Sequence, residues 1–403
     1  MSNLPDDINE LIENSLGEKL DNFEVSVHGT NEKGEGFVGE ILFLSLKHKI
    51  SGKEDHLVVK IVLVSEVETT IDFLSSSYLN EIYFYTELWP ALQAFQRKFP
   101  KVIPLDIVAH CYGDCREKGK EKIVLDNLKY KNYDVHPKTV PVSTELYTKT
   151  FELYGRYHAL SFAYKHHEKD EFQRLAKPLA NNWEGFLGLE MIKKEIHDDF
   201  FMMEEILRRN NENDVIRKIQ PYIKNGVEIF RRSLHYEGPN SVIVHGDSWS
   251  NNMMLKYNDS KELEDIKLID YQMATLGTPV YDLTYAFYSG ADQETLKSWE
   301  HFLKIYYNSL SKSLKDYDLD VENIYPYEIL KKEWKENIQF GFLMSLMIWG
   351  SKYLDIGDVS NLAVTGVETN MDLETWAYSN ANYVQAILNL ARHFSENDFF
   401  VTS

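Results

Sequence analysis

The distribution of apolar residues is the feature that most restricts the fold of this chain. Before about residue 140 the apolar runs are short and rich in β-branched residues, as in "ILFLSLKHKI" (41–50) and "HLVVKIVLV" (56–64), with Ser51-Gly52 between them. Two such runs around a turn predict a β-hairpin. After residue 140 the apolar residues recur with a helical period, as in "TELYTKTFELYGRYHALSFAYKH" (144–166). We therefore predict an α+β fold with a small β-rich N-terminal lobe and a large, mostly helical C-terminal lobe.

The length of 403 residues supports this division, because one compact core rarely grows so large. We place the N-terminal lobe at residues 1–128, ending in a hinge "IVLDNL" (123–128), and the C-terminal lobe at residues 129–403. The helix in "LNEIYFYTELWPAL" (79–92) is expected to end at Pro90. Two short strands, "SVIVHG" (241–246) and "IKLIDYQ" (266–272), are expected to form a hairpin-like insert within the helical lobe.

Composition and charge exclude several classes of protein. The formal net charge of −20 argues against nucleic acid or an anionic membrane as the main partner. The first residues, "MSNLPDDINELIENSL", lack the basic-then-apolar pattern of a signal peptide. The most apolar stretch, "FGFLMSLMIWG" (340–350), has about half the length of a membrane span. Cys111 and Cys115 are expected to be reduced thiols, because a zinc site needs four ligands. We expect a cytoplasmic protein.

Three polar residues follow the strands of the insert. Asp247 comes directly after the first strand, Asn252 follows five positions later, and Asp270 lies at the end of the second strand. Phosphoryl transfer needs a carboxylate that orients and deprotonates the attacking hydroxyl, and oxygen ligands for Mg²⁺. An aspartate after a glycine can also simply cap a turn. Because a loop between adjacent strands would bring all three together, we predict that Asp247, Asn252 and Asp270 form one phosphoryl-transfer site in which Asp247 is catalytic.

The first lobe contains residues suited to binding nucleotide phosphates. Lys60 is the only charge in "LVVKIVLV" (57–64), and Glu81 lies in the following helix. Each alone could be an ordinary exposed side chain, but together they match the strand lysine and helix glutamate of kinase folds. The glycine-rich stretch "KGEGFVGEILF" (33–43) would let backbone N–H groups approach phosphates, although such a cluster also marks plain hairpin turns. The loop residues predicted to bind nucleotide are Gly36, Phe37, Val38 and Gly39.

Four motifs give the chain a family resemblance: "HGDSWSNNMM" (245–254), "LIDYQ" (268–272), "TPVYDLTYAFY" (278–288) and "YHALSFAY" (157–164). They resemble the ecdysteroid kinase-like family, a branch of the choline kinase and aminoglycoside phosphotransferase group with a protein-kinase-like fold. The resemblance implies ATP and Mg²⁺ as cofactors. It implies that Asp247 is the catalytic base, that Asn252 and Asp270 are the Mg²⁺ ligands, and that Lys60 binds phosphate with Glu81 as its partner. It further implies that the Asp126 C=O and the Leu128 N–H bind adenine.

The chain departs from the family pattern in three places. The hinge reads Leu125-Asp126-Asn127-Leu128, where Leu-Glu-Asp-Leu is common. Gly39 stands where the family often carries a serine in the phosphate loop, so that side-chain contact is absent. Tyr271 follows the metal aspartate where phenylalanine or tryptophan is more usual. The hinge change leaves backbone contacts to adenine intact, because they do not depend on the side chains.

The acceptor is expected to be a hydroxyl of a small molecule. Asp282 follows Asp270 by 12 positions and no Ala-Pro-Glu comes after it, whereas protein kinases need a longer segment there to seat a peptide. The resemblance implies an ecdysteroid or a similar hydroxylated lipophile. A choline-like cation is the alternative substrate, because aromatic rings bind quaternary ammonium groups. A catalytically silent relative that only binds nucleotide or steroid is the alternative class. The substrate-binding residues stay unknown.

Other singled-out residues are expected to support the fold. His245 would orient the loop that carries Asp247, and Trp249 would pack beneath it. Asp282 would act as a helix N-cap or a loop anchor. His158 lies on an apolar helix face and is expected to be a hydrogen-bonded core residue. The apolar residues of 340–350 would form either core or the wall of a substrate pocket, of which core is the more common role for such a stripe: Phe340, Met344, Met347, Ile348 and Trp349.

Overall fold

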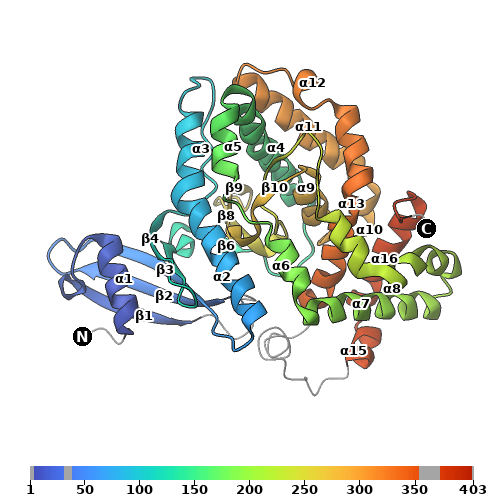
Figure 1. The fold of residues 1–403 in the computed structure, drawn as a ribbon, viewed down its shortest axis with the longest axis horizontal. Coiled ribbons are helices and arrows are strands. Elements are labelled where there is room, and N and C mark those ends of the chain that lie inside the picture. Colours follow the sequence, from blue (N-terminus) through green and yellow to red (C-terminus); the bar gives the residue numbers. More distant parts are fainter. Residues whose placement is uncertain (1–3, 31–38, 354–372, 402–403) are drawn as a thin grey trace.

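The computed structural model describes residues 4–30, 39–353 and 373–401. A small antiparallel sheet with one helix on it forms the N-terminal part, and a larger body of helices follows (Figure 1). Helices α2 and α3 lie between these two parts in this view (Figure 1). The predicted fold class is confirmed: the protein is a mixed α+β protein with a kinase-like arrangement.

The strands are β1 (Phe23–Thr30), β2 (Gly39–His48), β3 (Glu54–Val62), β4 (Cys111–Cys115), β5 (Lys122–Asp126), β6 (Asp134–Val135), β7 (Val242–Val244), β8 (Met253–Tyr257), β9 (Leu263–Leu268) and β10 (Thr275–Gly277). The α-helices are α1 (Asp6–Leu16), α2 (Glu68–Tyr83), α3 (Trp89–Gln96), α4 (Thr144–His167), α5 (Lys169–Ala176), α6 (Asn182–Gly188), α7 (Glu190–Arg209), α8 (Asn213–Ser233), α9 (Val280–Tyr288), α10 (Gln293–Lys297), α11 (Trp299–Asp316), α12 (Val321–Ile324), α13 (Tyr327–Tyr353), α15 (Leu373–Ser379) and α16 (Ala381–Glu396). The short helical turns are η1 (Leu20–Asn22), η2 (Phe84–Leu88), η3 (Leu128–Lys131), η4 (Ser250–Asn252) and η5 (Tyr271–Met273).

The five-stranded sheet has two different faces. Its order is β1-β2-β3-β5-β4, and the predicted hairpin of β2 and β3 around Ser51-Gly52 is confirmed. Successive side chains of a strand point to opposite faces. One face is covered by the apolar side of α1, which buries Leu42, Leu44, Leu46, Leu57 and Val59. On the opposite face Ile41, Phe43, Val58 and Lys60 are partly exposed, whereas Val62, Ile123 and Leu125 are buried against the rest of the protein.

The helix that follows the sheet does not end at Pro90, so that prediction is wrong. α2 ends at Tyr83, the π-helical turn η2 continues the chain, and α3 begins at Trp89. Pro90 lies in the first turn of α3. The first N–H groups of a helix have no partner within it, so a proline costs little at this position. The chain is helical from α2 through η2 to α3 without a break. The C-terminal end of α2, which carries Asn80 and Glu81, therefore lies between the sheet and the helical part.

The predicted hairpin between 241–246 and 266–272 is also wrong, because its two strands belong to different sheets. β7 pairs antiparallel with β10, whereas β9 pairs with β8, which in turn pairs with β6. Strand β8, which begins directly after Asn252, was not predicted from the sequence. The chain therefore leaves β7, turns through residues 245–252, and enters a second small sheet. This turn is the segment that carries Asp247.

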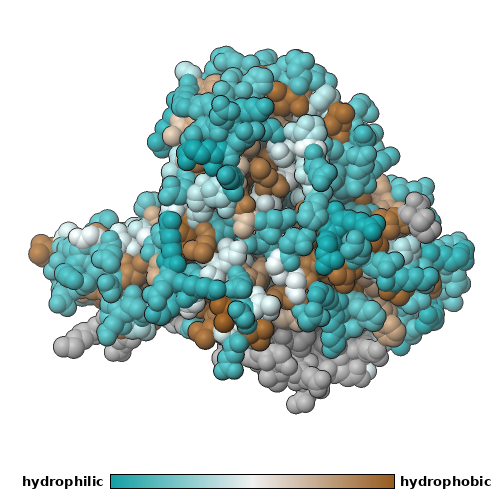
Figure 2. Space-filling model, viewed as in Figure 1, coloured by the Kyte–Doolittle hydropathy of each residue, from teal (hydrophilic) through white to brown (hydrophobic). Residues whose placement is uncertain are grey.

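The helical part has a continuous apolar core. Phe340, Met344, Met347, Ile348 and Trp349 are each at most 8% exposed, so this stripe is core and not an open pocket wall. Among the described residues, no helix is both long and apolar enough to span a bilayer. Figure 2 shows a mainly hydrophilic surface, in keeping with the net charge of −20, with hydrophobic patches where the small sheet meets the helices.

Candidate active site

Helix α9 anchors the loop that carries Asp247. The carboxylate of Asp282, fully buried in the first turn of α9, accepts the backbone N–H groups of His245 at 2.8 Å and Gly246 at 2.9 Å. The Ser248 hydroxyl donates to the Asp282 carbonyl at 2.9 Å. Two roles were predicted for Asp282, helix N-cap and loop anchor. It is the loop anchor, because Pro279 occupies the N-cap position of α9. Hydrogen bonds to a charged acceptor are stronger than neutral ones, so this contact holds the loop firmly.

Two histidines near this anchor have the roles predicted for them: His245 bonds to the Asp247 loop, and His158 is a hydrogen-bonded core residue. His158 is fully buried in α4, 3.2 Å from an Asp282 carboxylate oxygen and 3.1 Å from the Tyr306 hydroxyl. His245 accepts the Asp247 N–H on Nδ1 at 3.3 Å, so its Nε2 carries the proton and donates to the Ile269 carbonyl at 2.9 Å. Burial lowers the pKa of His245. The neutral imidazole thus connects the Asp247 loop to the chain immediately before Asp270.

Gly246 is required by the loop geometry. Its φ of +84° lies in the left-handed region, which side chains other than that of glycine rarely adopt. A Cβ at this position would overlap the carbonyl oxygen of Met273 and come within 2.8 Å of its carbonyl carbon. The glycine of the His-Gly-Asp motif therefore lets the loop pass close to the backbone of Met273, the last residue of η5.

Asp247 lies partly exposed at the end of this turn. The Asn252 amide donates to the Asp247 carboxylate at 2.7 Å and to its carbonyl at 2.9 Å. Burial raises the pKa of Asp247 to about 7, with a further contribution from the charge of Asp270, against side-chain hydrogen bonds from Tyr285, Asn252 and Trp249 that lower it. A general base is most effective when its pKa lies near the working pH. The environment of Asp247 therefore suits proton abstraction at neutral pH.

Lys60 joins the sheet to the helical part. Its ammonium lies 2.7 Å from the Glu81 carboxylate in α2 and 3.1 Å from the Asp270 carboxylate. Burial opposes the charge of Lys60, but the Asp270 and Glu81 carboxylates outweigh it and raise its pKa. Burial raises the pKa of Glu81, and the charge of Lys60 opposes this shift. Residues that are far apart in the sequence thus form one charged cluster on the face of the sheet that carries Lys60.

The backbone at Asp270 is strained. Its φ and ψ are both +68°, in the left-handed region that non-glycine residues rarely occupy. Such strain costs on the order of 1–3 kcal/mol and tends to occur at functional sites. The Asn80 amide holds the following turn by donating to the carbonyls of Gln272 at 3.1 Å and Ala274 at 2.7 Å, and Asn182 donates to Gln272 at 2.8 Å. This conformation aims the Asp270 carboxylate at Lys60.

Sequence reasoning missed Asn80, Asn182 and Tyr285. Asn80 precedes Glu81, and its side chain is 3% exposed. In the sequence, the available signal was a polar amide at a position on an apolar helix face, because such a buried amide needs hydrogen-bond partners. Tyr285 lies three positions after Asp282 and therefore on the same face of α9, toward the Asp247 loop. Asn182 begins α6, where no pattern in the sequence indicated a contact with η5.

The predicted adenine-binding residues lie at the end of β5. Asp126 is the last residue of β5, and its carboxylate accepts the Tyr112 hydroxyl at 3.0 Å and pairs with Lys131. Leu128 begins η3, and its N–H has no hydrogen-bond partner within the described ranges, so it is free to bind a ligand. Ile123 of the same strand pairs with Lys60 in β3. The strand therefore runs from the charged cluster to the hinge.

Gly39 is the first residue of β2 and pairs with Val62 of β3. A Cβ at Gly39 would overlap the Tyr78 hydroxyl and come within 2.8 Å of the Ile61 carbonyl oxygen, so a serine does not fit here without rearrangement. The other loop residues predicted to bind nucleotide lie outside the described residues: Gly36, Phe37 and Val38.

The donor set at the end of β9 suits Mg²⁺. Asp270 offers a carboxylate, and the carboxamide oxygen of Asn252 takes part in no hydrogen bond among the described residues. In the same residues no group of three or more His, Cys, Asp or Glu side chains could hold a metal by itself. Mg²⁺ commonly takes one or two protein ligands and completes its shell with phosphate oxygens and water. The pair of Asn252 and Asp270 therefore fits this ion together with a nucleotide.

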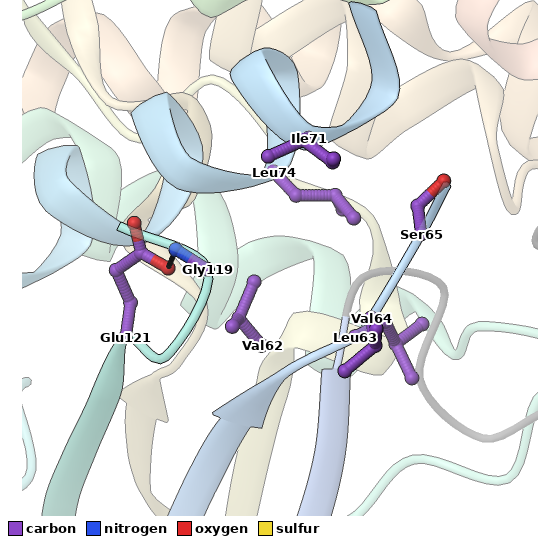
Figure 3. Close-up of a pocket in the computed structure, with 8 residues that line it drawn as sticks. All are labelled: Val62, Leu63, Val64, Ser65, Ile71, Leu74, Gly119 and Glu121. Carbon is purple, nitrogen blue, oxygen red and sulfur yellow. Dashed lines mark hydrogen bonds between the residues drawn. The ribbon is translucent and has the colours of Figure 1, made fainter. Parts of the chain in front are cut away.

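A small cavity in the N-terminal part lies apart from these residues. It has a volume of about 60 Å³ and lies between the end of β3, α2 and the turn before β5 (Figure 3). Val62 and Leu74 line it, and Glu121 at its edge accepts the Gly119 N–H at 2.8 Å (Figure 3). Lys60, Asp247 and Asp270 do not line it. The cavity is therefore separate from the candidate active site.

The fold is kinase-like, and the family that the chain matches suggests a small-molecule kinase-like protein. Residues 33–319 match the model of the ecdysteroid kinase-like family, and the chain belongs to this family. The predicted family resemblance is thereby confirmed. Members are typically kinase-like phosphotransferases, and kinase-like proteins in general use ATP. No curated protein matches the chain.

Proposed function

We propose that this protein is an ATP- and Mg²⁺-dependent kinase that phosphorylates a hydroxyl of an ecdysteroid or a similar hydroxylated lipophile. The contact of 3.1 Å between Lys60 and Asp270 carries the proposal, because it brings the predicted phosphate-binding lysine to the predicted metal ligand. These residues lie 210 positions apart. A lysine that holds nucleotide phosphates beside a metal-binding aspartate is the arrangement on which kinase folds rely.

In this proposal the N-terminal lobe, residues 1–128, binds the nucleotide. The Asp126 C=O and the Leu128 N–H bind adenine, and the backbone of residues 36–39 and the Lys60 ammonium bind the phosphates. Glu81 keeps Lys60 in place through their 2.7 Å ion pair. Asn252 and Asp270 would hold Mg²⁺, which neutralises charge on the phosphates when bound. Residues 129–403 form the lobe that supplies the base and receives the acceptor.

Asp247 is the proposed catalytic base. It accepts the proton of the acceptor hydroxyl, whose oxygen forms a bond to the γ-phosphorus while the bond between that phosphorus and the β,γ-bridging oxygen breaks. The products are the phosphate ester and ADP. Asn252 orients the Asp247 carboxylate through its 2.7 Å hydrogen bond. The raised pKa of Asp247, about 7, supports its role as a base near neutral pH.

Transfer of labelled phosphate tests the proposal. The protein is incubated with Mg²⁺, γ-labelled ATP and a panel of hydroxylated steroids and choline, and label in the acceptor is measured. We expect label in a steroid with the wild type, and a loss of about 10²–10⁴-fold with Asp247→Asn, which still binds ATP. The control Asp259→Asn alters an exposed aspartate in the turn after β8 and keeps full activity.

The other possible results of this transfer experiment would each change the proposal in a different way. Equal label in the wild type and Asp247→Asn would remove Asp247 from its role. Label in choline and in none of the steroids would replace the lipophile by a cationic acceptor. Binding of ATP without transfer to any acceptor or water would favour a catalytically silent relative. The presence of Asp247, Asn252, Asp270 and Lys60 in one connected cluster supports the active enzyme over that alternative.

A further inference from the structure

The hydroxyl of Tyr78 is a buried polar group without a partner. Tyr78 lies in α2, one helical turn before Glu81, and its side chain is 0% exposed. Within residues 4–30, 39–353 and 373–401 the hydroxyl oxygen has no hydrogen-bond partner. Leaving such a group unpaired costs roughly 1–3 kcal/mol, so buried hydroxyls in native proteins are normally paired with protein, water or ligand. A phenylalanine would fill the same space without this cost.

The position of this hydroxyl relates it to the proposed nucleotide site. It lies against Gly39, because a Cβ built on Gly39 would overlap the Tyr78 hydroxyl oxygen. The Lys60 ammonium lies 6.0 Å from the centre of the Tyr78 ring. No hydrogen bond joins Lys60 to the hydroxyl; the ammonium bonds to Glu81 and Asp270 instead. The hydroxyl is thus placed beside the backbone that ends the predicted phosphate loop and on the side of the predicted phosphate-binding lysine.

Other buried tyrosine hydroxyls also lack partners, and that of Tyr85 in η2 is likewise close to Glu81, Lys60 and Asp270. Tyr154 and Tyr157 lie in α4, within the core of the helical part. In α2 itself, the Tyr83 hydroxyl is paired and donates to the Leu175 carbonyl at 2.9 Å. What distinguishes Tyr78 is that its unpaired donor meets both the start of β2 and the surroundings of Lys60. A ligand that carries several acceptor oxygens and is held by Lys60 would satisfy it.

We propose that the Tyr78 hydroxyl is a further nucleotide-binding group, which donates a hydrogen bond to an oxygen of the triphosphate that Lys60 holds. This inference rests on the proposed function, because it requires a nucleotide at that site. Gly39 is then explained by the same contact: the absent side chain leaves the space that the Tyr78 hydroxyl needs. Helix α2 contributes to the nucleotide site at two places one turn apart, through Glu81 on Lys60 and through Tyr78 on the phosphates.

The variant Tyr78→Phe tests this inference, because it removes only the hydroxyl. Dissociation constants for ATP with Mg²⁺ and for adenosine are measured by calorimetry, and stability is measured by urea unfolding without nucleotide. We expect the Kd for ATP to rise at least fivefold, since a hydrogen bond to a charged acceptor is lost. The Kd for adenosine should not change, because adenosine has no phosphate. The unliganded variant should be as stable as the wild type or more so.

Tyr83→Phe is the matched control in the same helix. It loses a real hydrogen bond, to the Leu175 carbonyl, and should lower stability without changing the Kd for ATP. If the wild type binds ATP and Tyr78→Phe binds it equally well, the inference is overturned and the proposed function stands. An equal loss of ATP and adenosine binding, or a Tyr78→Phe protein less stable than the wild type, also overturns it. A wild type that does not bind ATP removes the proposed function, and the inference with it.

Discussion

The carboxylate of Asp282 accepts the backbone N–H of His245 at 2.8 Å, and this contact ties the loop of the proposed base to a helix of the core. The second carboxylate oxygen accepts the Gly246 N–H at 2.9 Å. The backbone N–H groups of the two residues before Asp247 are therefore both held by the side chain of Asp282. The position of the proposed base depends on α9, although Asp282 itself need not touch a substrate.

The first prediction concerns this anchor. Asp282→Asn keeps the shape of the side chain but replaces one acceptor oxygen by a donor NH₂, so one loop N–H group loses its partner. We expect the free energy of unfolding to fall by about 2–4 kcal/mol and kcat to fall at least tenfold. Urea unfolding and steady-state kinetics measure the two effects. Asp292→Asn is the control: Asp292 caps α10 by accepting the Thr295 N–H at 2.8 Å, and asparagine caps equally well. Unchanged kcat in Asp282→Asn would contradict the anchoring role.

The second prediction concerns the ion pair of Lys60 and Glu81. Glu81→Gln removes the negative charge 2.7 Å from the Lys60 ammonium and leaves Asp270 as its charged partner. Lys60 is then drawn toward the metal ligand and away from the phosphates, so we expect the KM for ATP to rise about tenfold or more while the KM for the acceptor is unchanged. Glu87→Gln, an exposed acid in η2, serves as the control. A KM for ATP that stays at the wild-type value would show that Glu81 does not position Lys60.

The third prediction is the pH dependence of the reaction. Burial and the charge of Asp270 raise the pKa of Asp247 to about 7. A base must be deprotonated to act, so kcat/KM should rise about tenfold per pH unit below pH 7 and level off above it. A profile measured from pH 5 to pH 9 locates this apparent pKa. An activity that is constant over that range would show that Asp247 titrates elsewhere or does not act as the base.

Stability should show the opposite dependence on pH. Between the usual pKa of 3.8 and the raised value of about 7, folded Asp247 holds a proton that the unfolded chain has released. The folded state therefore binds more protons in this window, and its stability falls as the pH rises through it. The side chain of the Asp247→Asn variant cannot ionise. As the pH rises from 4 to 8, the free energy of unfolding of this variant should therefore increase by about 1–3 kcal/mol relative to that of the wild type. Unfolding in urea at both pH values measures this difference.

The pairing of Lys60 with Glu81 could be predicted because both lie in locally regular segments and match a known kinase pattern. The α+β division followed from the change in apolar period at residue 140. The contact of Lys60 with Asp270 did not follow from any local pattern, and only the family motifs brought these residues together. Its geometry depends on the strained backbone at Asp270 and on the carbonyl contacts of Asn80, which are tertiary interactions.

Two of the small strands around the candidate site were predicted, but their pairing was beyond prediction for a physical reason. β7 and β10 have three residues each, too few to show an alternation of apolar and polar side chains. Their pairing is decided by the turn at Gly246, which passes over the Met273 carbonyl. In the same way, Pro90 could be recognised as a helix signal, but whether it ends one helix or begins another depends on η2.

The last prediction isolates the close approach at Gly246. Gly246→Ala should destabilise the protein for two reasons. The backbone φ is +84°, and the added Cβ would overlap the carbonyl oxygen of Met273. Gly52→Ala is the matched control, because Gly52 has a φ of +70° but no atom within 4 Å of its Cβ position. We expect Gly52→Ala to lower the free energy of unfolding by about 1 kcal/mol, which is the cost of the backbone conformation alone.

Gly246→Ala should lower the free energy of unfolding by at least about 3 kcal/mol, since a backbone carbonyl cannot move aside as a flexible side chain can. The difference between the two variants measures the clash itself. Gly246→Ala should also reduce kcat, because relief of the overlap moves the chain directly before Asp247, whereas Gly52→Ala leaves kcat unchanged. Equal loss of stability in both variants would mean that the loop can shift away from Met273, and the position of Asp247 would then not be fixed by this contact.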